Sequence, residues 1–379
     1  MEQFIQTNMK IEILRKRLID ALAVGGQMEG KTTVPSTEVT KIKIEPGSLK
    51  VTSTNMAIFI SKAVEIDYTG EPVQFCLSGK VLLGILKSIS DDSITLDVEE
   101  KILTVVHIKG TAELPLLAAD TYPMPKITGE AQSITVDAAF FVENINHAVK
   151  YVLESKDEDR PCMKCVRCYF HDGKFCIAAS NGYYIYVNRK PYDMSVFETT
   201  PADVLIPAKA VSVLKSIIPM DGTVTIKNRE NNFSVSVNGC NLFVTKVEGR
   251  YPDSERVLLR ETKRGRLSLS ELSAAVTRTS MLANKLSGLI KLTFESDRVR
   301  VEGKDIDFRT AGKEYCDCEG ELDGMFINLS AKWLSVALSD FPSENVGVCL
   351  VNETRLLQLV TDDYPYLVVG ILPLDPNLS

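Results

Sequence analysis

The segment LIPAKAVSVLKSII, from Leu205 to Ile218, is one of three closely related stretches in this chain. The others are LSGKVLLGILKSI, residues 77–89, and NLSAKWLSVALSDF, residues 328–341. Apolar residues recur three and four positions apart in each, a spacing that predicts a short amphipathic helix. A lysine lies near the start of each helix, and these lysines are Lys80, Lys209 and Lys332. The same helix therefore occurs three times, roughly 125 residues apart, which predicts three domains of one fold.

Each repeat also contains a second predicted helix and several predicted hairpins. The second helices begin near Arg15, at Asp137 and at Ser268, where Glu271 gives the spacing of a capping box. Alternating polar and apolar residues follow the helices, as in GTVTIKNRENNFSVSV (222–237), and predict antiparallel hairpins. The predicted fold is α+β, with three tandem domains in which about two helices pack on about eight antiparallel strands. The predicted domains are residues 1–126, 127–256 and 257–379.

The composition is that of an ordinary soluble globular protein. Hydrophobic residues make up 45% of the 379 residues and charged residues 25%. No stretch approaches the ~20 apolar residues that a membrane span needs. The N-terminal MEQFIQTNMKIEIL lacks the apolar core of a signal peptide, so we expect a cytoplasmic protein. Residues 1–8 precede the first patterned segment, and we expect them to be an extension.

Nine cysteines without a secretion signal indicate free thiols in a reducing compartment. Only PCMKCVRC, with Cys162, Cys165 and Cys168, has a spacing that could hold an iron–sulfur cluster. We expect these thiols in or beside a strand, where Cys165 faces away from the other two and the three cannot converge. The alternative is a cysteine- or metal-dependent enzyme that uses them with His171. Since no H-E-x-x-H, P-loop or G-x-S-x-G motif is present, we expect neither catalysis nor a cofactor.

The distribution of charge is uneven along the chain. The net charge of −7 argues against a protein coated with nucleic-acid-binding surface. The predicted helices are nevertheless net positive, and the remainder carries the acidic excess. Helices that share one surface would present their positive charge to a polyanion. Lysine is also a good helix former on any solvated face, so charge alone leaves both interpretations open.

Four further stretches, together with the threefold repeat, carry a resemblance to a known family. They are GTAELPLLAADTYP (110–123), LIPAKAVSVLKSI (205–217), FVTKVEGRYPDSERVL (243–258) and MLANKLSGLIKLTF (281–294). In this order and phase the chain resembles the bacterial DNA sliding clamp, the beta subunit of DNA polymerase III. The resemblance extends from Lys10 to about Leu374.

The resemblance implies a non-enzymatic processivity factor that acts on double-stranded DNA. Two chains would close head to tail into a ring, with antiparallel sheets outside and helices inside. Lysines on the repeated helices would face phosphates, and such contacts are independent of sequence and permit sliding. The implied DNA-contacting residues, which include two loops bordering the channel, are Lys31, Lys80, Lys87, Lys150, Lys156, Arg160, Lys164, Lys209, Lys215, Arg278 and Lys285.

The resemblance also implies an apolar pocket between the middle and last domains for short peptides of partner proteins. Those partners would be the polymerase III alpha subunit, the clamp loader and other proteins with a clamp-binding motif, and no membrane is implied. The alternative is that the aliphatic residues belong to the domain core. The implied pocket residues are Met163, Ser180, Gly182, Ile185, Pro252, Arg256, Val257, Asn328, Leu367, Val368 and Val369.

Two departures from the family pattern affect this pocket. The family usually has Asp-Gly-His-Arg-Leu in its middle domain, whereas this chain reads SNGYYIY, with Tyr183 and Tyr184 in place of the basic pair. The family tends to end on a Met-Pro-Met-like tail, whereas this chain ends on the longer YLVVGILPLDPNLS. Either VVG or ILPL could line the pocket, and we expect a peptide preference different from the family norm.

Overall fold

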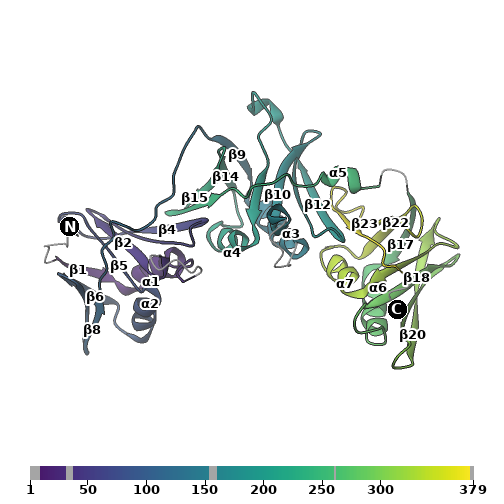
Figure 1. Ribbon diagram of the computed structural model, residues 1–379, viewed down its shortest axis with the longest axis horizontal. Coiled ribbons are helices and arrows are strands. Elements are labelled where there is room, and N and C mark those ends of the chain that lie inside the picture. Colours follow the sequence, from purple (N-terminus) through teal and green to yellow (C-terminus); the bar gives the residue numbers. More distant parts are fainter. Residues whose placement is uncertain (1–8, 31–36, 153–159, 260–261, 376–379) are drawn as a thin grey trace. The chain divides into compact units, whose positions relative to one another are not determined.

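The computed structural model describes residues 9–30, 37–152, 160–259 and 262–375 (Figure 1). In this part of the chain, three successive repeats each contribute eight strands and two helices of eight residues or more, which confirms the predicted content. Each repeat follows the order strand, helix, four strands, helix, three strands. The α+β fold class is therefore confirmed.

The bounds of the elements follow the repeats. The first repeat contains β1 (Met9–Leu14), α1 (Arg15–Gly25), β2 (Thr40–Glu45), β3 (Ser48–Thr54), β4 (Ile58–Glu65), β5 (Val73–Leu77), α2 (Gly79–Ser88), β6 (Ser93–Glu99), β7 (Ile102–His107) and β8 (Gly110–Pro115). The second contains β9 (Gln132–Asp137), α3 (Ala138–Ala148), β10 (Cys165–His171), β11 (Lys174–Ser180), β12 (Tyr184–Pro191), β13 (Val204–Pro207), α4 (Ala208–Ile217), β14 (Thr223–Asn228), β15 (Asn232–Val237) and β16 (Cys240–Thr245). The third contains β17 (Lys263–Ser268), α6 (Leu269–Ser280), β18 (Leu289–Phe294), β19 (Arg298–Asp305), β20 (Thr310–Gly320), β21 (Phe326–Ser330), α7 (Ala331–Leu338), β22 (Asn345–Leu350), β23 (Leu357–Val360) and β24 (Val368–Ile371). Short helical turns are η2 (Val149–Tyr151), η3 (Pro161–Lys164), η4 (Met194–Val196) and α5 (Ser254–Val257).

Contacts divide the chain into two compact units. The first comprises the residues up to Val142 together with Lys209–Lys246, and the second comprises Glu143–Ala208 and the residues from Val247 onward. The first unit has a sheet in the order β1-β6-β7-β8 and another in the order β5-β2-β3-β4-β16-β15-β14-β9. The second unit has one sheet in the order β13-β10-β11-β12-β24-β23-β22-β17-β20-β19-β18-β21. The two predicted boundaries between the three domains stay a prediction.

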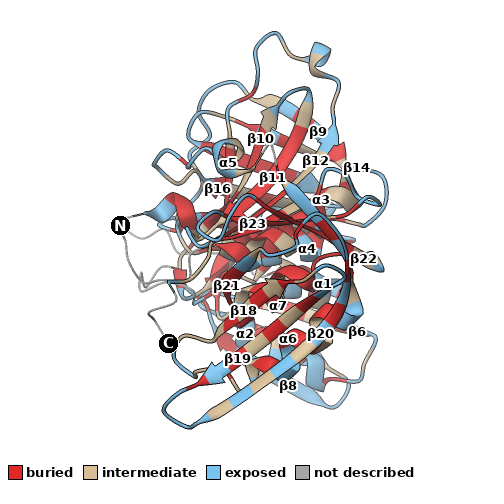
Figure 2. Cartoon of the chain, turned by 90° about the vertical axis from the view of Figure 1, so that its right-hand side faces the viewer, coloured by how far each residue is buried: buried red, intermediate tan, exposed pale blue. Residues whose placement is uncertain are grey.

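Regular alternation of apolar residues determines which face of each strand is buried. In β1, Met9, Ile11 and Ile13 are buried and the residues between them are exposed. Figure 2 shows the same alternation of buried and exposed residues along other strands. In the first repeat, α1 packs against α2, and Leu18 and Leu82 of these helices join the sheet residues in one core.

Side-chain caps begin the helices where the sequence predicts them. Asp137 Oδ1 accepts a hydrogen bond from the Phe140 N–H at 2.7 Å, ahead of α3. Ser268 Oγ accepts from the Glu271 N–H at 3.4 Å, ahead of α6. These bonds satisfy N–H groups that have no partner within the helix, and they confirm both predicted caps.

Strand pairing continues from one repeat into the next at two junctions. At the first junction, the fourth strand of the first repeat, β4, pairs antiparallel with the last strand of the second repeat, β16. At the second junction, the fourth strand of the second repeat, β12, pairs antiparallel with the last strand of the third repeat, β24. Each junction lies within one compact unit. Neighbouring repeats are therefore joined by one rule, in which a fourth strand pairs with the last strand of the following repeat.

None of the helices in the described ranges combines the length and the apolar character that crossing a membrane requires.

Candidate functional site

The repeated helix α2 presents two of the predicted DNA-contacting lysines. Lys80 and Lys87 are exposed and lie seven residues apart, which places them on the same side of the helix. Leu82 and Leu86 are buried against the core on the other side. The amphipathic pattern thus orients both ammonium groups toward solvent.

A buried carboxylate fixes the start of α2. Glu29 is almost fully buried, and its carboxylate accepts hydrogen bonds from the Thr40 hydroxyl at 2.6 Å and the Ser78 hydroxyl at 3.1 Å. It also accepts from the backbone N–H of Lys80 at 3.2 Å. A carboxylate at this position is stabilised by the partial positive charge of the helix N-terminus. Glu29 therefore holds the segment before Lys31 against the helix that carries Lys80, and sequence reasoning missed it.

The equivalent helix α4 carries Lys209 and Lys215, and both side chains are exposed. Val213, Leu214 and Ile217 of α4 are buried. Helix α4 is therefore amphipathic like α2, but its two lysines are six residues apart and point about 120° from each other around the helix axis.

Lys150 lies in a different environment. Its ammonium contacts Asp340 Oδ1 at 2.5 Å, and the Asp340 side chain is fully buried. His147 Nδ1 lies 2.5 Å from the same oxygen, and the Tyr151 hydroxyl donates to Asp340 Oδ2 at 2.7 Å. Burial alone would raise the pKa of Asp340, but the hydrogen bonds from these three groups hold that pKa below its usual value. Lys150 is thus engaged by a carboxylate of its own chain.

The remaining predicted DNA contacts fall into three groups. Arg278 is exposed but forms two hydrogen bonds to the carboxylate of Glu314, both at 2.9 Å. Arg160 and Lys285 are exposed, whereas Lys164 is half-buried. Lys31 and Lys156 lie outside the described residues.

The predicted pocket residues all belong to the second compact unit and come from separate segments. Ser180 and Gly182 form the turn between β11 and β12, and Ile185 follows in β12. Pro252, Arg256 and Val257 belong to the segment that leads from the second repeat to the third. Asn328 lies in β21, the others are at the C-terminal strand, and Met163 lies in η3. The strand pairing places Val368 opposite Val187 and Val369 opposite Tyr186.

These residues differ in how much surface they offer to a ligand. Leu367 and Val369 are buried and fill the interior, as the core alternative expects. Gly182, Pro252, Arg256 and Val257 are exposed, whereas Val368 is half-buried. The list of predicted pocket residues therefore contains both interior and surface positions.

The C-terminal segment beyond β24 continues beside the predicted pocket. The Leu372 N–H donates to the Tyr183 carbonyl at 2.7 Å, and the Leu374 N–H donates to the Asn328 carbonyl at 2.9 Å. VVG is therefore the strand that pairs with β12, whereas ILPL is the part that runs along Tyr183 and Asn328. Both motifs therefore contact residues that are predicted to form the pocket or neighbour them, in successive positions.

An aromatic stack replaces the basic pair of the family at this place. The Tyr183 ring stacks on Trp333 of α7 with centroids 4.9 Å apart, and the Tyr184 ring stacks on Trp333 at 5.6 Å. Tyr184 also donates its hydroxyl hydrogen to the Lys150 carbonyl at 2.8 Å. Tyr183 remains 55% exposed. Sequence reasoning identified both tyrosines as departures but missed Trp333, the only tryptophan in the chain.

Polar contacts fix the segment that follows the second repeat. The Tyr251 hydroxyl accepts a hydrogen bond from the Ser180 N–H at 2.9 Å. Glu255 pairs with Arg189 at 2.8 Å and accepts from the Tyr169 hydroxyl at 2.7 Å. Burial would raise the pKa of Glu255, but hydrogen bonds from Arg189 and Tyr169 lower it below the usual value. These contacts therefore hold in place the backbone that carries the exposed residues at the end of this segment.

The cysteine cluster does not form a metal site. Cys162 lies in η3, not in a strand, and it packs with Cys165 in one apolar cluster. The expectation that Cys165 faces away from Cys162 was therefore wrong, because the helical turn that starts at Pro161 breaks the alternation of a strand. Burial raises the pKa of the Cys165 thiol to about 12. Among the described residues, no group of three or more His, Cys, Asp or Glu side chains is placed to hold a metal ion.

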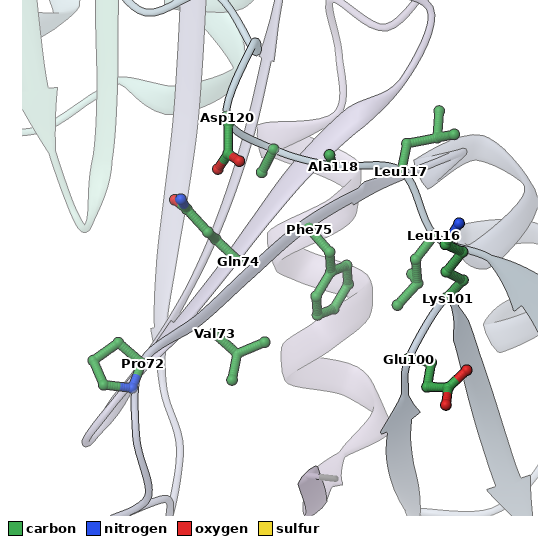
Figure 3. A pocket seen from close by; sticks show the side chains of 11 residues that line it. Pro72, Val73, Gln74, Phe75, Glu100, Lys101, Leu116, Leu117, Ala118 and Asp120 are labelled. Carbon is green, nitrogen blue, oxygen red and sulfur yellow. The ribbon is translucent and has the colours of Figure 1, made fainter. Parts of the chain in front are cut away.

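A cavity of about 150 Å³ lies in the first repeat, and none of the predicted site residues lines it (Figure 3). Gln74 and Asp120 lie at one end of it, and Glu100 and Lys101 approach the other end. Phe75 and Leu116 supply its apolar wall. The cavity brings together no set of groups with an evident chemical task.

Comparisons with known proteins agree with this architecture. Residues 9–126 match the family model for the N-terminal domain of the DNA polymerase III beta subunit, and residues 136–253 match the model for its central domain. A beta sliding clamp of Buchnera aphidicola is 22% identical over 364 residues, which cover 95% of each chain. A beta sliding clamp of Pseudomonas aeruginosa is also 22% identical and covers 95% of this chain and 99% of that protein.

Solved structures show the same fold. A DnaN sliding clamp from Pseudomonas aeruginosa superposes with a TM-score of 0.89 at 20% identity, covering 97% of this chain and 100% of the other. A DNA polymerase sliding clamp from Bacillus subtilis gives a TM-score of 0.88, also at 20% identity and with the same coverage. The two family matches together cover more than half of the chain, and the chain belongs to the DNA polymerase III beta subunit family.

Proposed function

We propose that this protein is a DNA sliding clamp, a non-enzymatic processivity factor that encircles duplex DNA in the cytoplasm as a ring-shaped homodimer. Family membership supports the assignment, as do the sliding clamps of the same fold. The observation that carries the proposal is the rule of strand pairing between repeats, because it predicts how the chain joins a second copy.

Among the described strands, two have no partner from another repeat under this pairing rule. The last strand of the first repeat, β8, lies at the edge of its sheet. The fourth strand of the third repeat, β20, pairs with β17 only through Cys318–Gly320, and its first residues pair with β19 alone among the described strands. We expect β20 of one copy to pair antiparallel with β8 of the next, as β4 pairs with β16. An unsatisfied strand edge is a ready partner for such pairing.

Apolar side chains next to these strands support the same interface. Ile108, just before β8, is 86% exposed, and Phe308, just before β20, is 70% exposed. Pairing of the two strands would remove both groups from water, and the burial of apolar surface would favour the contact. A head-to-tail contact of this kind generates rings when it closes, and closure with two copies is the family arrangement.

The exposed lysines would attract DNA without fixing the position of the protein along the DNA sequence. In this proposal, Lys80, Lys87, Lys209 and Lys215 face the phosphates, with Lys31, Lys156, Arg160, Lys164 and Lys285 as further contacts. Phosphate contacts carry no sequence information, so a closed ring can slide along the duplex. Lys150 and Arg278 remain in the proposed set, but their pairing with Asp340 and Glu314 reduces the charge they offer.

The predicted pocket would receive peptides from the polymerase III alpha subunit, the clamp loader and other proteins with a clamp-binding motif. Its exposed residues, Gly182, Pro252, Arg256 and Val257, would contact the peptide directly. Tyr183, stacked on Trp333, adds a flat aromatic surface beside them. Aromatic surfaces of this kind often dominate peptide affinity.

Retention on DNA of different topology tests the proposal. The protein would be loaded onto nicked circular DNA by a clamp loader with ATP, and the circle would then be linearised by a restriction enzyme. We expect the protein to stay on the circle and to leave the linear molecule. Equal retention on both forms at moderate salt would show ordinary binding rather than encirclement and would reject the proposal.

A further inference from the structure

A second groove lies at the first junction, on the solvent face of β4 and β16. Its volume is about 320 Å³, and its floor is formed by Phe59 and Phe243 of these two strands. One wall is the segment that leads from the first repeat to the second, where Met124 is 51% exposed and Ile127 is 57% exposed. None of these residues belongs to the proposed DNA or peptide sites. The groove lies entirely within the first compact unit.

The turn beside this groove repeats the turn beside the proposed peptide pocket, bond for bond. Thr54 Oγ1 donates to the Ile58 carbonyl at 2.8 Å, and Ser180 Oγ donates to the Tyr184 carbonyl at 3.0 Å. The Met56 N–H donates to Thr54 Oγ1 at 2.9 Å, as the Gly182 N–H donates to Ser180 Oγ at 3.1 Å.

An asparagine occupies the same place in both turns. Asn55 Oδ1 accepts from the Ile58 N–H at 2.7 Å, and Asn181 Oδ1 accepts from the Tyr184 N–H at 3.1 Å. Met56 adopts a φ of 75°, where Gly182 has a φ of 91°. A methionine in this conformation is strained, so the turn is retained in the first repeat at a conformational cost.

The adjoining segments are also equivalent, and a tyrosine hydroxyl anchors each. A Tyr-Pro pair begins each segment. The Tyr122 hydroxyl donates to the Thr52 carbonyl at 3.3 Å, beside the turn, whereas the Tyr251 hydroxyl accepts from the Ser180 N–H at 2.9 Å. Counting from these tyrosines, Ile127 stands at the place of Arg256. In the strands, Phe59 corresponds to Ile185, and Asn241 corresponds to Val368. The first junction thus has the framework of the proposed pocket with a more apolar wall.

The two grooves differ in charge. The segment at the second junction carries Asp253 and Glu255, where the first junction has Met124 and Lys126. Lys50 is the charged residue that lines the first groove, and the Arg229 guanidinium lies 5.9 Å from the centre of the Phe243 ring. The rim of the first groove is therefore cationic, which is complementary to an acidic partner.

We propose that the groove at the first junction is a second peptide-binding site, which takes a linear acidic peptide through one large apolar side chain. The inference rests on the proposed function, because it uses the pocket at the second junction as its template. The floor of the groove consists of strands that are already paired on both sides. The peptide is therefore held by its anchoring side chain and its charge rather than as an added strand.

Site-specific crosslinking tests the proposal on the full-length protein. The probe is a fluorescent peptide in which a photoreactive phenylalanine is flanked by leucine and four glutamates. We expect it to label the segment 122–127 or β16, as identified by mass spectrometry. Ile127→Glu should weaken probe binding at this site about ten-fold, because it places a negative charge in the apolar wall. Met220→Glu, at a comparably exposed position in the same unit, should leave binding unchanged.

Charge substitutions distinguish binding of the probe peptide at the first junction from its binding elsewhere on the protein. Lys50→Glu should weaken labelling at the first junction, whereas Lys50→Arg should preserve it. Val257→Glu should affect only labelling at the second junction. Labelling confined to residues 252–257 or β24 would overturn the second site and leave the proposed pocket standing. Absence of labelling at both junctions would also overturn it, while DNA retention would still report on the proposed clamp function.

Discussion

The first and second junctions of this chain share a turn, a Tyr-Pro segment and a strand pairing, yet they differ in what surrounds that framework. The second junction adds the buried Asp340 with its three partners and the stack of Tyr183 on Trp333. The first junction adds a cationic rim and exposed apolar residues. The framework therefore joins neighbouring repeats. In our proposals, the additions determine what each junction binds and how firmly the junction is held.

The largest effect is expected at a third junction, between two copies. If β8 and β20 pair as the two internal junctions do, Ile108→Glu combined with Phe308→Glu buries two charges in the contact. We expect the dimer dissociation constant to rise by a factor on the order of 100. Light scattering after size-exclusion chromatography across a concentration series measures this. Val196→Glu, another exposed apolar position, is the control, and an unchanged dimer in the double variant would refute the proposed pairing.

The next effect concerns the buried carboxylate of the second junction. Asp340→Asn removes the charge that pairs with Lys150 and His147, and we expect a loss of about 2 kcal/mol in the free energy of unfolding. Urea titration measures it, with the exposed Asp363→Asn as control.

The same carboxylate predicts a pH dependence. Because the pKa of Asp340 is lowered in the folded state, its contribution is present above its unfolded pKa of about 4 and is lost as the pH falls through the folded value. The wild-type protein should therefore lose more stability below pH 4 than Asp340→Asn does. Parallel pH profiles of the two proteins would contradict the assigned role.

The next prediction compares a lysine that already pairs with a carboxylate of its own chain with a lysine that faces solvent. Lys209→Met removes an exposed charge, whereas Lys150→Met removes one that Asp340 already pairs with. We expect the first variant to weaken DNA loading several-fold. The dependence of DNA affinity on salt concentration should also become weaker, by the amount that the loss of about one phosphate contact produces. We expect the second to have a smaller effect, with Lys227→Met as a control. Loading titrations at several salt concentrations measure both, and a larger effect of Lys150→Met would reverse this ranking.

The smallest expected effects come from a direct comparison of the tyrosine that anchors the first junction with the tyrosine that anchors the second. Tyr122→Phe and Tyr251→Phe each remove one hydroxyl that anchors a junction turn. We expect each to cost about 1 kcal/mol in the free energy of unfolding. Urea titrations of the two variants should therefore agree closely, and a neutral result for only one would show that the two turns are not anchored alike.

Most of the fold could be predicted from the sequence because it depends on local periodicity and on repetition. The helix that starts at Arg15, the helix that follows the Ser268 cap and the eight strands in each repeat follow from residue spacing alone. The exception at Cys162 has a local cause, since the helical turn at Pro161 interrupts the strand pattern.

Much of the site could not be predicted, because it depends on side chains that are distant in the sequence. The sequence predicts Lys150 as a phosphate contact, but it does not predict that Asp340, 190 residues further along, lies beside it. Glu29 and Trp333 have no unusual sequence context. Only the folded chain shows that Glu29 forms buried hydrogen bonds and that Trp333 stacks on Tyr183. Amphipathic helices reveal which lysines face outward, but not which are already neutralised.

Because a fourth strand pairs with the last strand of the following repeat, the two surfaces that meet at each junction are different from each other. Among the described strands, the first repeat leaves its last strand, β8, and the third repeat leaves its fourth strand, β20, without a partner from another repeat, so the rule pairs unlike strands. Copies that meet by this rule are related by rotation, and the two sides of a closed assembly are chemically unlike. In the proposed ring, every copy would then display its Tyr183 surface on the same side, so a partner that binds this surface would have a fixed orientation along the duplex.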